Sequence, residues 1–236
     1  MNVPLVLTHF LDRAVSLYGD KVGVISEEKT LTYRELYERV NQLSHGLSDI
    51  GVKKGDRVAY LAPNTLEMLE GFYGVFQTGA IMVPLNIRLK PDDYVFILNH
   101  SESKVLFVDA ELYHLIAPVK NELQTVEHVI VHGKTDDIAE IAYDTWLAQY
   151  TTEPFARPDI DENDVCSLLY TSGTTGNPKG VMLTHRNNYL HALSTMHHLR
   201  VSDRDVYLHI LPMFHVNGWG GTVLLYSERS DARLLA

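Results

Sequence analysis

The sequence predicts an α/β protein built from stacked βαβ layers with mostly parallel sheets. Short apolar runs of strand character alternate along the chain with segments whose apolar residues recur at helical spacing. Such alternation is typical of a parallel sheet covered by helices on both faces. The chain has 236 residues, of which 45% are hydrophobic and 21% charged, which is the size and composition of a globular protein with a large core.

Local signals place the first elements. An amphipathic helix is expected over residues 3–18, followed by a hairpin over residues 22–32. Thr32, with Glu35 three residues later, forms a capping box, which predicts that the next helix begins there. Gly51 suits the left-handed position that follows a helix, so this helix is expected to end near it.

The following segments repeat the alternation. Strands are expected over residues 56–62, 80–84, 104–109 and 127–132, and helices over residues 63–79, 91–99 and 110–123. Residues 133–164 are more polar and contain Pro154 and Pro158. We interpret them as a surface connection with one short helix at about residues 143–150.

Charge and cysteine content exclude several classes of protein. Thirty acidic residues against 20 basic ones give a net charge of −10, which disfavours nucleic-acid binding. The one cysteine, Cys166, permits no internal disulfide and no cysteine zinc site, and we expect it to be inert packing in a cytoplasmic protein. No His, Asp or Glu spacing indicates a protein metal site, and no apolar stretch approaches the roughly 20 residues of a membrane span.

The segment from residue 171 to residue 180 has the chemistry of a phosphate loop. It follows an expected strand over residues 165–170 and precedes a helix over residues 185–199. Its glycines bring backbone N–H groups close to oxygen atoms, its four hydroxyls add donors, and Lys179 adds a positive charge. It is not a Walker A loop, because it lacks the Gly-Lys-Ser/Thr string: Lys179 follows Pro178 and precedes Gly180. Residue chemistry alone leaves two interpretations open, a phosphate site and an exposed flexible loop.

The string over residues 170–180, Tyr-Thr-Ser-Gly-Thr-Thr-Gly-Asn-Pro-Lys-Gly, resembles the phosphate-binding signature of the adenylate-forming superfamily, which includes the AMP-forming acyl-CoA synthetases. Residues 211–219, Leu-Pro-Met-Phe-His-Val-Asn-Gly-Trp, look like the next motif of that family. Residues 31–36, 55–59 and 79–86 also match in type and order. The resemblance runs from about residue 5 to about residue 224.

The resemblance implies ATP-dependent activation of a carboxylic acid to an acyl-adenylate, which coenzyme A then converts to an acyl-CoA with release of AMP. The residues that would hold the ATP phosphates with Mg²⁺ are Thr171, Ser172, Gly173, Thr174, Thr175, Gly176 and Lys179. The residues that would line the acyl pocket are Phe214, His215, Val216, Gly218 and Trp219. The catalytic set would be Thr174, Lys179 and His215. Taken alone, a histidine is as well explained by a structural hydrogen bond and a tryptophan by core packing.

The resemblance also implies that residues 1–236 form only part of an N-terminal domain. The expected divisions are a first α/β subdomain over residues 5–132, a connection over 133–164, a phosphate-loop and acyl-pocket segment over 165–225, and an atypical tail over 226–236. Two functions stay open. The first is a ligase for a medium- or long-chain fatty acid, as a homodimer or with a separate chain that supplies the missing half. The second is a non-catalytic remnant that at most binds nucleotide or a partner chain.

Overall fold

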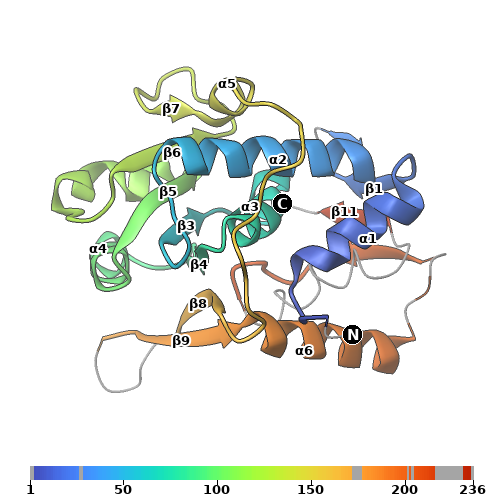
Figure 1. Ribbon diagram of the computed structural model, residues 1–236. Helices are drawn as coiled ribbons and strands as arrows, with labels where there is room; N and C mark the ends of the chain where they lie inside the picture. Colours follow the sequence, from blue (N-terminus) through green and yellow to red (C-terminus); the bar gives the residue numbers. More distant parts are fainter. Residues whose placement is uncertain are drawn as a thin grey trace.

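The computed structural model describes residues 3–26, 29–171, 177–200, 202, 205–215 and 231–234. Figure 1 shows how its helices and strands are arranged. The strands are β1 (Val22–Ile25), β2 (Thr30–Thr32), β3 (Arg57–Leu61), β4 (Ile81–Pro84), β5 (Ser103–Asp109), β6 (His128–His132), β7 (Ile141–Ala142), β8 (Val165–Thr171), β9 (Lys179–Thr184), β10 (Val206–His209) and β11 (Asp231–Leu234). The helices are α1 (Thr8–Tyr18), α2 (Tyr33–Asp49), α3 (Leu66–Gln77), α4 (Pro91–His100), α5 (Tyr143–Leu147) and α6 (His185–Leu199), with 3-10 helices η1 (Ala110–Leu115) and η2 (Ala117–Glu122).

A seven-stranded sheet in the order β7-β6-β5-β3-β4-β8-β9 organises the fold. All neighbouring strands in it run parallel except β9, which pairs antiparallel with β8. Alternate residues of the central strand β3 enter two different cores: Val58 and Tyr60 pack with α2 and α3, whereas Ala59 and Leu61 pack with α4. Both faces of the sheet are therefore covered, which confirms the predicted α/β fold.

At the centre of this sheet, the connections that follow two neighbouring parallel strands run to opposite sides. The chain leaves β3 through α3 and returns in β4 on one side, whereas it leaves β5 and continues outward to β6 on the other side. Strands β3 and β5 are direct parallel neighbours, with Leu61 opposite Val108. The connections that follow these two strands consequently diverge, and they leave a crevice beyond their carboxyl ends.

A second sheet has four strands in the order β10-β11-β1-β2. The hairpin expected over residues 22–32 forms its antiparallel β1–β2 pair. Strand β11 lies parallel to both β1 and β10, so part of the segment treated above as a tail is a strand in this sheet.

The capping prediction for α2 is confirmed. The Thr32 hydroxyl accepts from the Glu35 amide at 3.2 Å, while the Glu35 carboxylate accepts from the Thr32 amide at 2.7 Å. The helix ends at Asp49, and Gly51 takes a left-handed φ of +85°. Cys166 is buried as expected, and burial raises the pKa of its thiol to about 12, so the thiol stays protonated at neutral pH.

Two predicted helices were wrong in extent or type. The first helix begins at Thr8 instead of residue 3. In the segment before it, the amides of Leu5 and Leu7 donate to the Glu162 carboxylate and the His185 imidazole, at 2.8 and 3.4 Å. The predicted α-helix over residues 110–123 is the η1–η2 pair of 3-10 helices. Pro118 lacks an N–H and disfavours helical geometry in the residue before it, which explains the break.

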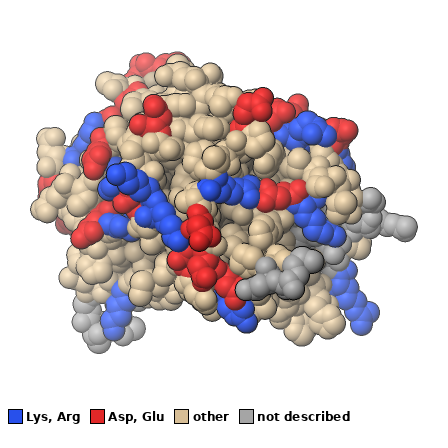
Figure 2. Space-filling model, in the orientation of Figure 1, with Lys and Arg blue, Asp and Glu red and all other residues tan. Residues whose placement is uncertain are grey.

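The face of the molecule seen in Figure 2 carries acidic and basic side chains side by side. Along the described part of the chain, no helix combines the length and apolarity needed to cross a bilayer.

Candidate phosphate-loop site

The hairpin of β8 and β9 holds the two ends of the predicted phosphate loop together. In its register Tyr170 lies opposite Gly180, and Thr171 opposite Lys179. The connection between the two strands therefore begins and ends at one residue pair, Thr171 and Lys179. Five predicted phosphate ligands, Ser172, Gly173, Thr174, Thr175 and Gly176, lie outside the described residues.

Lys179 stands at the point where the loop returns to the sheet. Its side chain is exposed, and within the described residues it forms no ion pair. An anion bound in the loop therefore meets an ammonium group that no described carboxylate neutralises. Thr171, at the other end of the loop, is exposed as well.

The side chains of Leu168 and Tyr170 lie close to Gly180, the glycine at the end of the signature. A Cβ atom on Gly180 would lie 2.9 Å from Leu168 Cδ1 and 3.3 Å from the Tyr170 ring. The Tyr170 hydroxyl in turn hydrogen-bonds His100 Nδ1 at 2.7 Å, which ties the hairpin to the end of α4. The base of the loop is therefore fixed against the body of the sheet.

The described part of the predicted acyl motif has a buried start and an exposed end. Met213 and Phe214 are buried, whereas His215 is exposed and its amide donates to the Pro212 carbonyl at 3.0 Å. Val216, Gly218 and Trp219 lie outside the described residues.

A buried asparagine holds this motif in place, and sequence reasoning missed it. Asn64 Nδ2 donates to the carbonyls of His209 and Leu211 at 3.2 and 3.0 Å. Its Oδ1 accepts from the Met213 amide at 2.8 Å. The sequence predicted that a helix starts at Pro63 and Asn64. The helix cap is in fact Thr65, so Asn64 is free to make these long-range bonds.

Both motifs meet the large sheet at its carboxyl edge. The phosphate loop leaves the end of β8, and Asn64 follows the end of β3, two strand positions away. With about 4.8 Å between neighbouring strands, the two strand ends are separated by about 10 Å. His209, which precedes the acyl motif, is buried, and burial lowers its pKa to about 4, so its ring is neutral near pH 7.

The chain is an α/β protein whose large sheet is covered on both faces, and its sequence places a glycine- and hydroxyl-rich connection between β8 and β9. The family model described as "AMP-binding enzyme" matches residues 11–231, and the chain belongs to that family.

Curated relatives and solved structures agree with this assignment. The chain is 40% identical over 225 residues to a long-chain-fatty-acid–CoA ligase of Thermus thermophilus, covering 93% of this chain and 41% of the relative. It is 37% identical over 232 residues to a 3-methylmercaptopropionyl-CoA ligase of Ruegeria pomeroyi, covering 93% and 43%. The crystal structure of the anthranilate CoA ligase AuaEII with anthranoyl-AMP matches with a TM-score of 0.92 and 26% identity, over 100% of this chain and 46% of that one. The chain thus spans less than half the length of these proteins.

Proposed function

We propose that this chain supplies the phosphate loop and part of the acyl pocket of an ATP-dependent acid–CoA ligase. In the first step a substrate carboxylate oxygen attacks the α-phosphorus of ATP, and the bond to the bridging oxygen breaks to release pyrophosphate. In the second step the sulfur of coenzyme A attacks the acyl carbonyl carbon, and AMP leaves. The observation that carries this proposal is the β8–β9 register, which sets exposed Lys179 at the base of a hydroxyl-rich loop.

The proposed role of the loop is electrostatic. Lys179, with the hydroxyls of Thr171, Ser172, Thr174 and Thr175, would bind the β- and γ-phosphates and stabilise the charge that builds up on pyrophosphate. These hydroxyls and the lysine suit a magnesium–triphosphate, in which Mg²⁺ binds phosphate oxygens and retains water. When bound, Mg²⁺ would neutralise part of the triphosphate charge.

The proposed acyl pocket begins at the buried end of the second motif. Phe214 would form its wall, and His215 would contact the carboxylate or the α-phosphate; Val216, Gly218 and Trp219 would continue the lining. We infer a medium- or long-chain fatty acid as substrate. Relatives named as long-chain- and medium-chain-fatty-acid ligases support this choice, although others are named for butyrate and benzoate.

A calorimetric titration of the 236-residue chain with MgATP tests the phosphate site. Lys179→Ala should weaken MgATP binding at least tenfold, because one direct charge contact with the triphosphate is lost. Lys53→Ala, which removes an exposed lysine from the turn before β3, should leave the affinity unchanged. Equal affinities for the wild type and Lys179→Ala would refute the assignment.

The coverage of the relatives supports a second proposal, that catalysis needs a further polypeptide portion, in the same chain or in a separate one. Without it the chain would bind nucleotide but turn nothing over. Acid-dependent AMP formation by this chain alone, measured with a fatty acid, ATP and Mg²⁺, would disprove that requirement.

A further inference from the structure

A tyrosine at the start of the phosphate-loop signature contacts the end of a helix that lies far away in the sequence. Tyr170 precedes Thr171 at the end of β8, and its Oη lies 2.7 Å from Nδ1 of His100, the last residue of α4. The two rings meet edge to face, with 5.8 Å between their centroids and 84° between their planes. A hydrogen bond and a ring contact therefore join two side chains that are 70 residues apart.

The Tyr170 ring also lies against the strand that returns from the loop. Tyr170 is opposite Gly180 in the β8–β9 register, and a Cβ atom on Gly180 would lie 3.3 Å from Tyr170 Cζ. Lys179 is the residue before Gly180 and lies opposite Thr171. The ring that His100 holds at its hydroxyl end is thus in contact with the backbone beside Lys179.

His100 is itself held in place from two sides. Its ring stacks on Phe96, one turn earlier in α4, with 5.2 Å between the centroids and 22° between the planes. The two residues after it are bound by Arg57 at the start of β3, which donates to the carbonyls of Ser101 and Glu102 at 2.5 and 3.0 Å. Since Arg57 ties this helix end to the central strand β3, a bond to His100 fixes its partner relative to the large sheet.

The end of the hairpin gains support from this contact. Strand β9 is the last strand in the order of the large sheet, and Val181 and Met182 in it are exposed. Leu168 packs on the core that α4 covers, whereas Thr171 and Lys179, further out, are exposed. The bond to His100 adds a polar anchor between these two regions.

We propose that His100 is a positioning residue for the phosphate loop, which acts through Tyr170 to hold the hairpin end that carries Lys179. The inference rests on the proposed function of the loop. A hairpin end that is fixed before the nucleotide arrives does not have to be ordered during binding, so the affinity is higher. One hydrogen bond is worth roughly a factor of 2 to 10 in an equilibrium constant, which sets the size of the expected effect.

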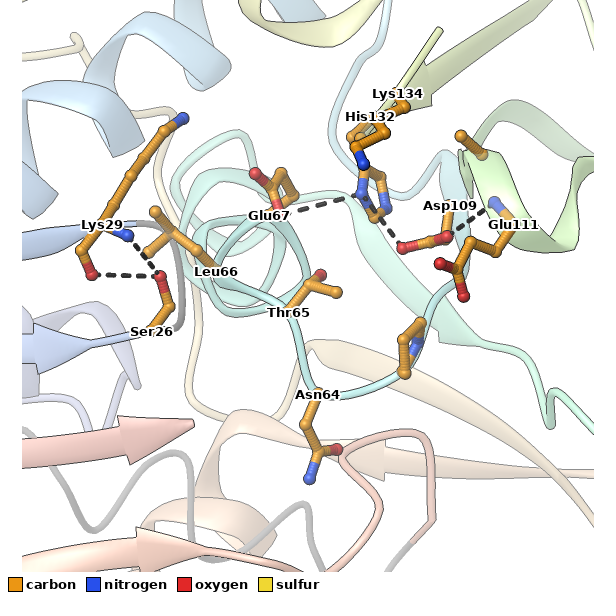
Figure 3. Close-up of a pocket in the computed structure, with 13 residues that line it drawn as sticks. Ser26, Lys29, Asn64, Thr65, Leu66, Glu67, Asp109, Glu111, His132 and Lys134 are labelled. Atoms are coloured by element: carbon orange, nitrogen blue, oxygen red, sulfur yellow. Dashed lines mark hydrogen bonds and ion pairs between the residues drawn. The ribbon is translucent and has the colours of Figure 1, made fainter. Parts of the chain in front are cut away.

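MgATP affinity is a measure of the loop because the crevice beyond β3 and β5 is a poor site for a triphosphate. Figure 3 shows this crevice, a cavity of about 420 Å³. The carboxylates of Glu67, Asp109 and Glu111 line it, against the ammonium groups of Lys29 and Lys134. The excess of negative charge disfavours a polyanion there.

Calorimetric titration of the 236-residue chain with MgATP tests the proposal. His100→Phe keeps a ring against Phe96 and removes the nitrogen that bonds Tyr170, so it should weaken binding about threefold to tenfold. Tyr170→Phe should weaken it by the same factor. His114→Phe is the matched control, because His114 Nδ1 makes a similar exposed bond of 2.7 Å to the Glu111 carbonyl; this variant should bind MgATP as the wild type does.

Two further variants separate the hydrogen bond from ring packing. His100→Asn removes the ring but places an amide atom close to the position of Nδ1, so its affinity should stay within about twofold of the wild type. Weaker binding by His100→Asn than by His100→Phe would assign the effect to ring packing and overturn the proposal. The double variant of His100→Phe with Tyr170→Phe should bind no more weakly than either single variant, because both remove the same bond. Additive losses would also overturn it.

Hydrogen exchange of the ligand-free chain distinguishes this inference from the proposed function. In His100→Phe the amides of residues 170, 171, 179 and 180 should exchange at least about threefold faster, whereas His114→Phe should leave them unchanged. If the wild type binds no MgATP, the proposed function fails and the positioning role with it, while the exchange rates still show whether His100 anchors the hairpin. If Lys179→Ala weakens binding and His100→Phe does not, the positioning role alone is refuted. Thermal unfolding of each variant confirms that it is folded.

Discussion

Replacing Asn64 by alanine should detach the acyl-motif segment from the body of the fold. The residue is 8% exposed, and its side chain makes three hydrogen bonds, of 2.8, 3.0 and 3.2 Å, to backbone groups about 150 residues further along the chain. Each such bond contributes about 1 kcal/mol net, and a buried group that loses its partner costs about 1–3 kcal/mol. We therefore expect Asn64→Ala to lower the free energy of unfolding by about 3 kcal/mol.

The assay combines urea unfolding with hydrogen exchange at one amide. The Met213 N–H, which donates to Asn64, should exchange at least tenfold faster in the variant. Asn99→Ala is the matched control, because Asn99 clamps the Glu122 carbonyl and the Gln124 amide at 2.9 and 2.8 Å in an exposed setting. Water replaces exposed partners, so this control should cost less than about 1 kcal/mol. Equal costs for the two variants, or unchanged exchange at Met213, would refute the reasoning.

Three further predictions concern the packing and charge of the core. Gly71→Ala should destabilise the protein by about 1–3 kcal/mol in urea unfolding, despite the better helix propensity of alanine, because its Cβ would lie 2.4 Å from the buried Tyr60 ring. Arg39→Met should cost about 3–5 kcal/mol, since it leaves the Glu70 carboxylate, which has 0% side-chain exposure, without its cation. Acidification from pH 6.5 to 4 should destabilise the fold by up to about 3 kcal/mol through His185 alone, because burial lowers its folded pKa to about 4.

Each of these predictions has a control. For Gly71→Ala the control is Ser48→Ala, an alanine substitution at an exposed position of α2, which should not lower the free energy of unfolding. The double variant Arg39→Met with Glu70→Leu should recover part of the loss, because no lone buried charge remains; failure to recover would contradict the charge explanation. For His185, the unfolded chain takes up a proton below pH 6.5 while the folded chain resists until about pH 4, so stability is lost as the pH falls. The variant His185→Gln should show a shallower pH dependence of unfolding, and an unchanged slope would disprove the assignment.

The sequence alone determined the features that depend on neighbouring residues. Three such features could be predicted: the capping box at Thr32 and Glu35, the glycine after α2, and the alternation of strands with helices. A few adjacent side chains decide each of them. The family could be predicted from the sequence for the same reason, because the phosphate-loop signature is one continuous string.

Only the tertiary structure decided what depends on strand order. The sequence of β3, β4 and β5 does not say that β5 returns to the far side of β3, yet that choice creates the crevice beside Asp109 and His132. It also brings Asn64 to a segment about 150 residues away. A polar residue at the end of an apolar strand or a few residues beyond it was the one available signal for these side chains. Their partners could not be predicted from the sequence, because long-range contacts follow from the packing of the whole sheet. Such contacts produce no periodic pattern of residues along the chain.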